Sequence, residues 1–293
     1  MMAGDHVGRI IDRLAWRNRL LRIPLFATLR HRARSARQAA FTMPEEVMES
    51  GLALIRDLRD DAAHIGHIAD LLGSSASVLD SLGDGALATA LDALGRDLIE
   101  SEDILHRWPA VYMLGLEERL LRLAELYLGE PCYFLGISMK RERVSPIETG
   151  ARQWHLDIED DRMLRLLVYL NDVDEGTGPF THVPATESAV AHAAMGYRGG
   201  YIPEARFGGI VPPETWRTAQ GRAGTLVAFD GTRIFHRAGR PTERERLSLS
   251  LTWSSRHPRQ ILRPVRLRLA TRRRLLAGLN ARQRACIPPA RWS

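Results

Sequence analysis

The segment that decides the fold is Arg246-Leu247-Ser248-Leu249-Ser250-Leu251-Thr252-Trp253. Apolar and polar residues alternate along it without a break, which is the pattern of a β-strand with two different faces. The leucines share one face, and the other carries Arg246, Ser248, Ser250 and Thr252. If this polar face points inward, an anion is needed beside Arg246. The alternative is an ordinary polar face exposed to solvent.

The same period of two extends outward from this segment. From residue 132 onward, short strand-like runs are separated by turns rich in Gly and Pro, such as Asp174–Pro179. Many short strands with such turns predict a sandwich, barrel or jelly roll. The runs before the deciding segment are Cys132–Met139, Gln153–Ile158, Leu164–Asn171, Gly224–Phe229 and Ile234–Ala238.

The first part of the chain has a different pattern, with apolar residues at helical spacing. Leu116–Leu128 is the clearest helix and stops at Gly129-Glu130-Pro131, a helix C-terminal signal. Residues 7–38 form an Arg-rich amphipathic pattern interrupted at Pro24. Such a segment either packs on the domain or lies on a membrane surface. The expected organisation is an N-terminal helical region (1–130), a β core (131–255) and an Arg-rich C-terminal helix or tail (256–293).

Composition and charge bound the function classes. Hydrophobic residues make up 45% and charged residues 26% of the 293 residues, as in a globular protein. No apolar run is long enough to span a bilayer. Cys132 and Cys286 lie far apart and have no metal-ligand spacing, so no disulfide framework and a cytoplasmic location are expected.

The net charge of +6 is unevenly distributed. Residues 1–40 hold +7, residues 246–293 hold +12, and the segment between them holds −13. The basic ends either touch nucleic acid or an anionic membrane, or lie against the acidic middle. No nucleic-acid-binding motif accompanies them, so no specific nucleic-acid partner is expected.

Candidate chemistry begins at Gln153-Trp154-His155-Leu156-Asp157. In a strand, residues two apart share a face, so His155 and Asp157 would project together. Ile234-Phe235-His236 supplies a second imidazole shortly before the deciding strand. Two histidines and one carboxylate on one face of an octahedral ion suit Fe(II) and leave positions open for further ligands. A bare His-x-Asp pattern is weak, and the distal histidine and Arg246 strengthen it.

Over residues 116–253 the sequence resembles the phytanoyl-CoA dioxygenase-like group of Fe(II)/2-oxoglutarate oxygenases. The matching features are the helix before residue 129, His155-x-Asp157, the distal His236, and Arg246 ten residues beyond it. Val168–Val173 followed by Gly176–Phe180 is similar to the family's strand and turn. The segment Val183-Pro184-Ala185-Thr186 departs from the family, which usually has Pro-Gly-Ser-His there.

The resemblance implies a double-stranded β-helix (jelly roll, cupin-like) core with N-terminal helices packed outside. It implies His155, Asp157 and His236 as iron ligands, Arg246 as the 2-oxoglutarate anchor with Ser248, and Gln153 as a further contact. The implied cofactors are Fe(II) and 2-oxoglutarate, with ascorbate as an optional reductant. The implied reaction uses O2 to hydroxylate a C–H bond of a small-molecule or carrier-bound substrate and releases succinate and CO2.

Two other hypotheses stay open at this point. A cupin-like metalloprotein would share the fold and the three ligands but would not need Arg246 and Ser248. A non-enzymatic binding protein would instead use its basic ends. Residues 196–223 are expected either to cover the site as a lid or to form a plain loop, His182 to lie in a loop, and His64 and His67 to lie on a helix as surface or packing residues.

Overall fold

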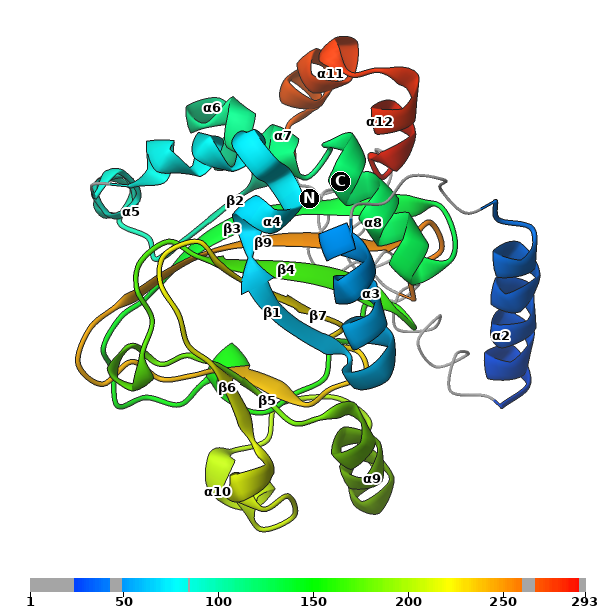
Figure 1. Cartoon of the computed structure of the whole chain (residues 1–293), viewed down its shortest axis with the longest axis vertical. Coiled ribbons are helices and arrows are strands. Elements are labelled where there is room, and N and C mark those ends of the chain that lie inside the picture. The colour runs from blue at the N-terminus through cyan, green and yellow to red at the C-terminus, as the bar shows by residue number, and fades with distance from the viewer. Residues whose placement is uncertain (1–23, 43–48, 84, 260–266, 290–293) are drawn as a thin grey trace, which may run out of the picture.

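The computed structural model describes residues 24–42, 49–83, 85–259 and 267–289. Two antiparallel sheets form the centre of this part of the chain, and most of the helices lie above the larger sheet in the view of Figure 1. The larger sheet has six strands in the order β1-β7-β4-β9-β3-β2. The smaller sheet has three strands in the order β6-β5-β8.

Chain order and spatial order differ in both sheets, so the strands pair over long sequence distances. The six-stranded sheet contains β1 (Ala63–His67), β2 (Leu98–Glu100), β3 (Cys132–Glu142), β4 (Met163–Tyr169), β7 (Thr225–Phe229) and β9 (Arg246–Ser255). The three-stranded sheet contains β5 (Phe180–His182), β6 (Arg217–Ala219) and β8 (His236–Ala238).

Helices precede, interrupt and follow the sheets. Those before β3 are α2 (Pro24–Ala39), α3 (Glu49–Asp61), α4 (Ile68–Leu72), α5 (Ala86–Leu94), α6 (Ser101–Arg107), α7 (Pro109–Leu114) and α8 (Glu118–Leu128). Those after it are α9 (Ala185–Met195), α10 (Glu204–Gly208), α11 (Leu269–Gly278) and α12 (Ala281–Cys286). Short 3-10 helices span Gly73–Leu82, Gly150–Arg152, Glu175–Thr177 and Pro213–Thr215.

Five of the six predicted strand runs are strands, with ends shifted by a few residues, and the predicted helix before Gly129 is α8. Gly129 ends α8 with φ of 70°, a left-handed conformation that favours glycine. The prediction for Gln153–Ile158 was wrong, because this segment makes only isolated bridges at Trp154 and His155. Beyond them the backbone turns away, and Asp157 N–H donates to the Gly231 carbonyl at 2.7 Å.

Several short strands were not predicted. His64 and His67, expected on a helix, lie on β1, which pairs with β7, and His182, expected in a loop, lies on β5. β1 and β2 therefore bring the region expected to be helical into the large sheet. Strands of three to five residues carry too few alternations to be distinguished from helix or loop. The division of the chain into three regions stays a prediction.

The large sheet separates two kinds of interior. Its helix-covered face is apolar and joins Leu249, Leu251 and Trp253 of β9 to buried leucines of α3 and α8. The opposite face of β9 carries the polar set predicted for it, and its ladder partners on β4 are Tyr169 across from Ser248 and Arg165 across from Thr252. Because directly paired residues share a face, Arg246, Ser248 and Arg165 point to the same side of the sheet.

Several arginines of the two basic ends form ion pairs with acidic residues of the middle segment. Arg34 and Arg37 form ion pairs with Glu130 at 3.3 and 2.9 Å, and Arg282 pairs with Glu125 at 2.8 Å. These contacts favour the packing alternative for the basic ends. Most of the amphipathic pattern proposed for membrane contact, residues 7–23, lies outside the described residues.

Among the residues that the structure describes, no helix combines the length and the apolar character needed to cross a bilayer.

Candidate metal centre

The three predicted ligands meet between the sheets. His155 bridges to His236, the first residue of β8, and their rings lie 4.3 Å apart between centroids. One donor atom from each of His155, Asp157 and His236 lies within 4.8 Å of the others. His155 and His236, joined by the bridge, each offer a ring nitrogen. Asp157, two residues after His155, offers a carboxylate oxygen to the same point.

Backbone contacts orient both imidazoles. His155 Nδ1 donates to the Gln153 carbonyl at 2.9 Å, and His236 Nδ1 donates to the Ile234 carbonyl at 3.1 Å. A carbonyl can only accept, so the proton of each neutral ring is on Nδ1 and the Nε2 lone pair is available. Metal-binding histidines are held in this way in proteins, by a bond from the nitrogen that does not bind the metal.

The protonation states also suit a cation. Burial lowers the pKa of His155, and burial together with the neighbouring His155 lowers the pKa of His236 to about 3. Burial would raise the pKa of Asp157, but the positive charge of the adjacent Arg165 guanidinium outweighs this effect, and the pKa is lowered. At neutral pH the set is therefore two neutral imidazoles and one carboxylate, the forms that bind a metal.

Arg165 was not predicted as part of the site. Its Nε lies 2.7 Å from Asp157 Oδ2, and its Nη2 donates to Glu159 at 3.1 Å. Asp157 Oδ1 lies 3.9 Å from His236 Nε2, so one carboxylate oxygen faces the histidines while the other is held by the guanidinium. The sequence signal available was an arginine in an otherwise apolar strand, Met163–Tyr169.

Gly231 leaves the space that this arrangement needs. A Cβ at this position would lie 2.1 Å from Asp157 Oδ2 and 2.8 Å from His236 Cε1. Phe229 and Phe180 pack near His236 with ring centroids 5.0 and 5.7 Å away. Glycine at residue 231 therefore leaves room for the Asp157 carboxylate, and the two aromatic rings limit the position of the His236 ring.

Arg246 is buried, with 2% of its surface exposed, and burial lowers its pKa. Its Nε and Nη1 have no hydrogen-bond partner among the described residues. Glu142 lies opposite it in the β3–β9 ladder, but Glu142 already forms ion pairs with Lys140 and Arg152. A buried guanidinium with unsatisfied donors matches the geometry of a carboxylate that is brought by a ligand.

Ser248 and Gln153, the other two residues predicted to contact 2-oxoglutarate, are placed differently. Ser248 is buried two residues from Arg246 and on the same face of β9. Gln153 is half-buried, and its backbone accepts a hydrogen bond from the His155 ring and donates one to the Gly150 carbonyl. Its side-chain role stays a prediction.

The 196–223 segment covers one side of the site. Ile202 bridges to Trp154, whose ring stacks on Phe207 at 4.4 Å and meets Trp216 at 4.8 Å. Tyr201 is 54% exposed and its ring lies edge-on to His155 at 5.1 Å. The segment is therefore packed on the residues around the first ligand and is more than a plain loop.

Comparison with known proteins gives a fold but no family. No family model matches the chain, and no curated protein matches it in sequence. Among solved structures, EctD from S. alaskensis, in complex with 2-oxoglutarate and 5-hydroxyectoine, is 18% identical with a TM-score of 0.51. The match covers 73% of this chain and 79% of EctD. At this identity the likeness shows a shared fold.

Two further structures are similar over a comparable share of the chain. The epimerase SnoN, in complex with Fe3+, alpha ketoglutarate and nogalamycin RO, is 19% identical over 71% of this chain and 85% of its own, with a TM-score of 0.49. HygX from Streptomyces hygroscopicus, with nickel and 2-oxoglutarate bound, is 15% identical over 71% of this chain and 87% of its own, with a TM-score of 0.48.

Proposed function

We propose that this chain is an Fe(II)- and 2-oxoglutarate-dependent oxygenase in which His155, Asp157 and His236 hold the iron. Arg246, with Ser248, binds the far carboxylate of 2-oxoglutarate. The single observation that carries the proposal is the buried Arg246 guanidinium, whose Nε and Nη1 have no hydrogen-bond partner among the described residues. It lies on the same sheet face as the residue that holds Asp157. A metal site without an anionic co-substrate would not need it.

The residues present fit both groups. Two neutral imidazoles with free Nε2 atoms and a carboxylate form the donor set that Fe(II) accepts while leaving positions open. When bound, iron and 2-oxoglutarate would supply the chemistry that oxidises a substrate C–H bond. The reaction would consume O2 and 2-oxoglutarate and release succinate and CO2. Arg165 holds Asp157 in place, and the guanidinium fork of Arg246 orients a carboxylate by two parallel bonds.

The strand arrangement supports a double-stranded β-helix as the finer description of the fold. In the large sheet, β3, β9, β4 and β7 are consecutive neighbours. The facing sheet contains β6, β5 and β8, and His155 bridges to it. The strands therefore alternate between the two sheets for most of the way from residue 132 to residue 255. A closer relationship to the phytanoyl-CoA dioxygenase-like group belongs to the same proposal.

The proposed reaction is hydroxylation of a small-molecule or carrier-bound substrate. Asp157 occupies a ligand position, and this favours oxygen insertion over halogenation, in which a halide needs that position. Tyr201 is exposed beside His155 and is the aromatic surface that a substrate would meet first. A cytoplasmic location remains a prediction from the cysteine content.

Anaerobic addition of Fe(II) and then 2-oxoglutarate tests the proposal without knowledge of the substrate. The wild-type protein should develop the visible charge-transfer absorption of a chelated Fe(II)–2-oxoglutarate pair. Asp157→Ala should lower iron affinity by more than about 100-fold, because loss of a ligand should exceed the 10- to 100-fold cost of losing an outer partner. A screen of candidate substrates for succinate formation would then identify the reaction.

Glu175→Ala is the matched control, since Glu175 lies in the 3-10 helix before β5 and belongs to neither site. It should bind iron and 2-oxoglutarate as the wild type does. Iron binding with no 2-oxoglutarate absorption would favour the cupin-like alternative. Full succinate formation by Asp157→Ala would refute the ligand assignment.

A further inference from the structure

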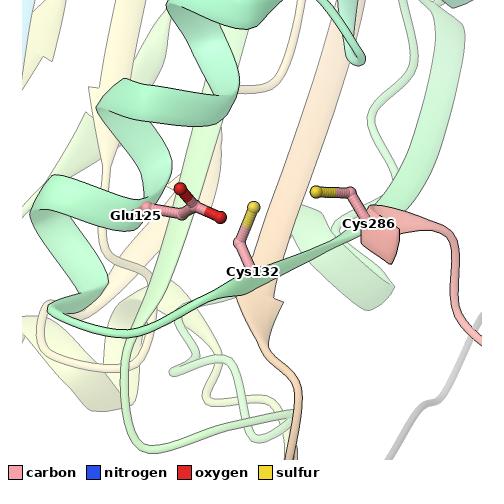
Figure 2. A group of neighbouring side chains, drawn as sticks. All are labelled: Glu125, Cys132 and Cys286. Atoms are coloured by element: carbon pink, nitrogen blue, oxygen red, sulfur yellow. The ribbon is translucent and has the colours of Figure 1, made fainter. Parts of the chain in front are cut away.

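A second group of metal-binding side chains lies on the other side of the large sheet. Cys132 begins β3, Cys286 ends α12, and Glu125 lies on α8. Both thiols are 0% exposed and Glu125 is 4% exposed. Both sulfurs and one oxygen of the Glu125 carboxylate lie within 4.8 Å of one another. Figure 2 shows the Cys286 sulfur pointing toward Cys132, whose own sulfur lies between Glu125 and Cys286.

These are the chain's two cysteines, and they come from segments far apart in the sequence. Cys132 belongs to the apolar cluster between the helices and the sheet, whereas His155 and His236 lie between the two sheets. The two groups therefore occupy different layers of the fold and differ in chemistry, because one is rich in sulfur and the other has none.

The spacing fits coordination by one ion. Metal–sulfur bonds of about 2.3 Å place two sulfurs on a tetrahedral zinc ion roughly 3.8 Å apart. The observed limit of 4.8 Å allows this separation. A disulfide would instead bring the sulfurs to about 2.05 Å, and both cysteines are free thiols here.

The surrounding charges would balance such an ion. Arg282 Nη2 donates to Glu125 Oε2 at 2.8 Å, as outer partners of metal-binding carboxylates do. Arg256 donates to the Cys132 carbonyl at 3.4 Å. A divalent ion that displaces one proton from each thiol and contacts the carboxylate leaves a complex of charge −1, and the Arg282 guanidinium offsets it.

We propose that Cys132, Cys286 and Glu125 form a structural site for a thiolate-binding divalent cation of the zinc type. Bound there, the ion would join the C-terminal helix α12 to β3 and to α8. The proposal does not depend on the oxygenase function. Complete burial argues against a redox switch as the role of the thiols, because sensor cysteines are solvent-accessible.

Cobalt titration of the reduced, chelator-treated full-length protein tests the site, since a thiolate bound to Co2+ gives a sulfur-to-metal charge-transfer absorption in the near ultraviolet. The wild type should show this absorption, and cobalt binding should release about two protons per chain. Zn2+ should displace the cobalt and abolish the absorption. The double variant His155→Ala/Asp157→Ala should retain it. Cys286→Ser should lose it but still bind cobalt at the histidine centre.

Absence of the absorption in wild-type protein with both thiols reduced would overturn the proposal. A second outcome would also overturn it: the protein binds no second metal ion, and hydrogen peroxide converts the two thiols to a disulfide. In that reaction the thiols lose two hydrogens and the peroxide is reduced to water. If Cys286→Ser does not fold, wild-type protein suffices. Zinc should slow maleimide labelling of both thiols in mild denaturant, and equal rates with and without zinc would contradict the site.

Discussion

The two faces of the large sheet are made by the same strands but hold opposite kinds of side chain. On the helix-covered face, Leu249, Leu251 and Trp253 of β9 pack into one apolar cluster. On the other face, the same strand carries Arg246 and Ser248 toward the smaller sheet. Charged groups on the first face form ion pairs at its edges, as Arg282 does with Glu125. On the second face, the guanidinium of Arg246 has donors without partners.

This difference indicates that one face of the sheet stabilises the fold and the other binds ligands. Apolar burial and satisfied ion pairs stabilise the folded chain, whereas an unsatisfied buried charge costs stability and is retained where a ligand completes it. Substitutions on the helix-covered face should therefore alter stability more than ligand binding. Substitutions between the sheets should alter ligand binding more than stability.

Trp253→Ala should have the largest effect and should act on stability alone. The indole is fully buried, lies 5.5 Å from the Phe134 ring and donates to the Gly115 carbonyl. Its removal should lower the free energy of unfolding in urea by about 3–5 kcal/mol. Leu269→Ala, at a position that is 59% exposed, should change it by less than about 0.5 kcal/mol. Reduced iron affinity of the folded Trp253→Ala protein would break the comparison.

Gly231→Ala should have the largest effect between the sheets. The added methyl group would overlap Asp157 Oδ2, so iron affinity measured by calorimetry should fall by more than about 100-fold. Gly208→Ala is the control, because its Cβ would meet ordinary contacts at 3.7 Å. Equal iron affinity in the two variants would show that the space at Gly231 is not required for the metal centre.

Arg246→Met should separate binding from stability most clearly. Loss of charge-assisted hydrogen bonds of about 1.5–3 kcal/mol should weaken 2-oxoglutarate binding by roughly 10- to 100-fold. The unfolding free energy of the ligand-free protein should change less than 2-oxoglutarate binding does, because Nε and Nη1 of Arg246 have no hydrogen-bond partner to lose among the described residues. Arg165→Met leaves Asp157 and Glu159 without their cation, and it should lower both stability and iron affinity. Similar behaviour of the two variants would remove the distinction between a ligand-binding and a structural arginine.

Ser248→Ala should have the smallest effect. A single hydroxyl bond of about 0.5–1.5 kcal/mol corresponds to a rise of roughly two- to tenfold in the KM for 2-oxoglutarate, with kcat unchanged. Ser250→Ala, two residues farther along the same face of β9, should leave KM unchanged. A larger effect at Ser250 than at Ser248 would move the anion-binding position along the strand.

Part of the site could be predicted because its signals are local. The alternation of residues 246–253 assigns Arg246 and the leucines to opposite faces before any partner strand is known, and the pairing with β4 confirms that division. His155 and Asp157 were also brought to a common point, though by a bridge followed by a turn and not by the regular strand expected. The predicted roles of the three ligands await the experiments above.

What the sequence by itself determined is the period-two pattern after residue 131, the faces of β9 and the choice of candidate ligands. Tertiary structure alone decided that Arg165 holds Asp157, that His64 lies on a strand, and that Cys132 meets Cys286. The physical reason is that alternation is encoded in neighbouring residues, whereas these contacts join segments whose meeting depends on how the whole sheet and its covering helices pack.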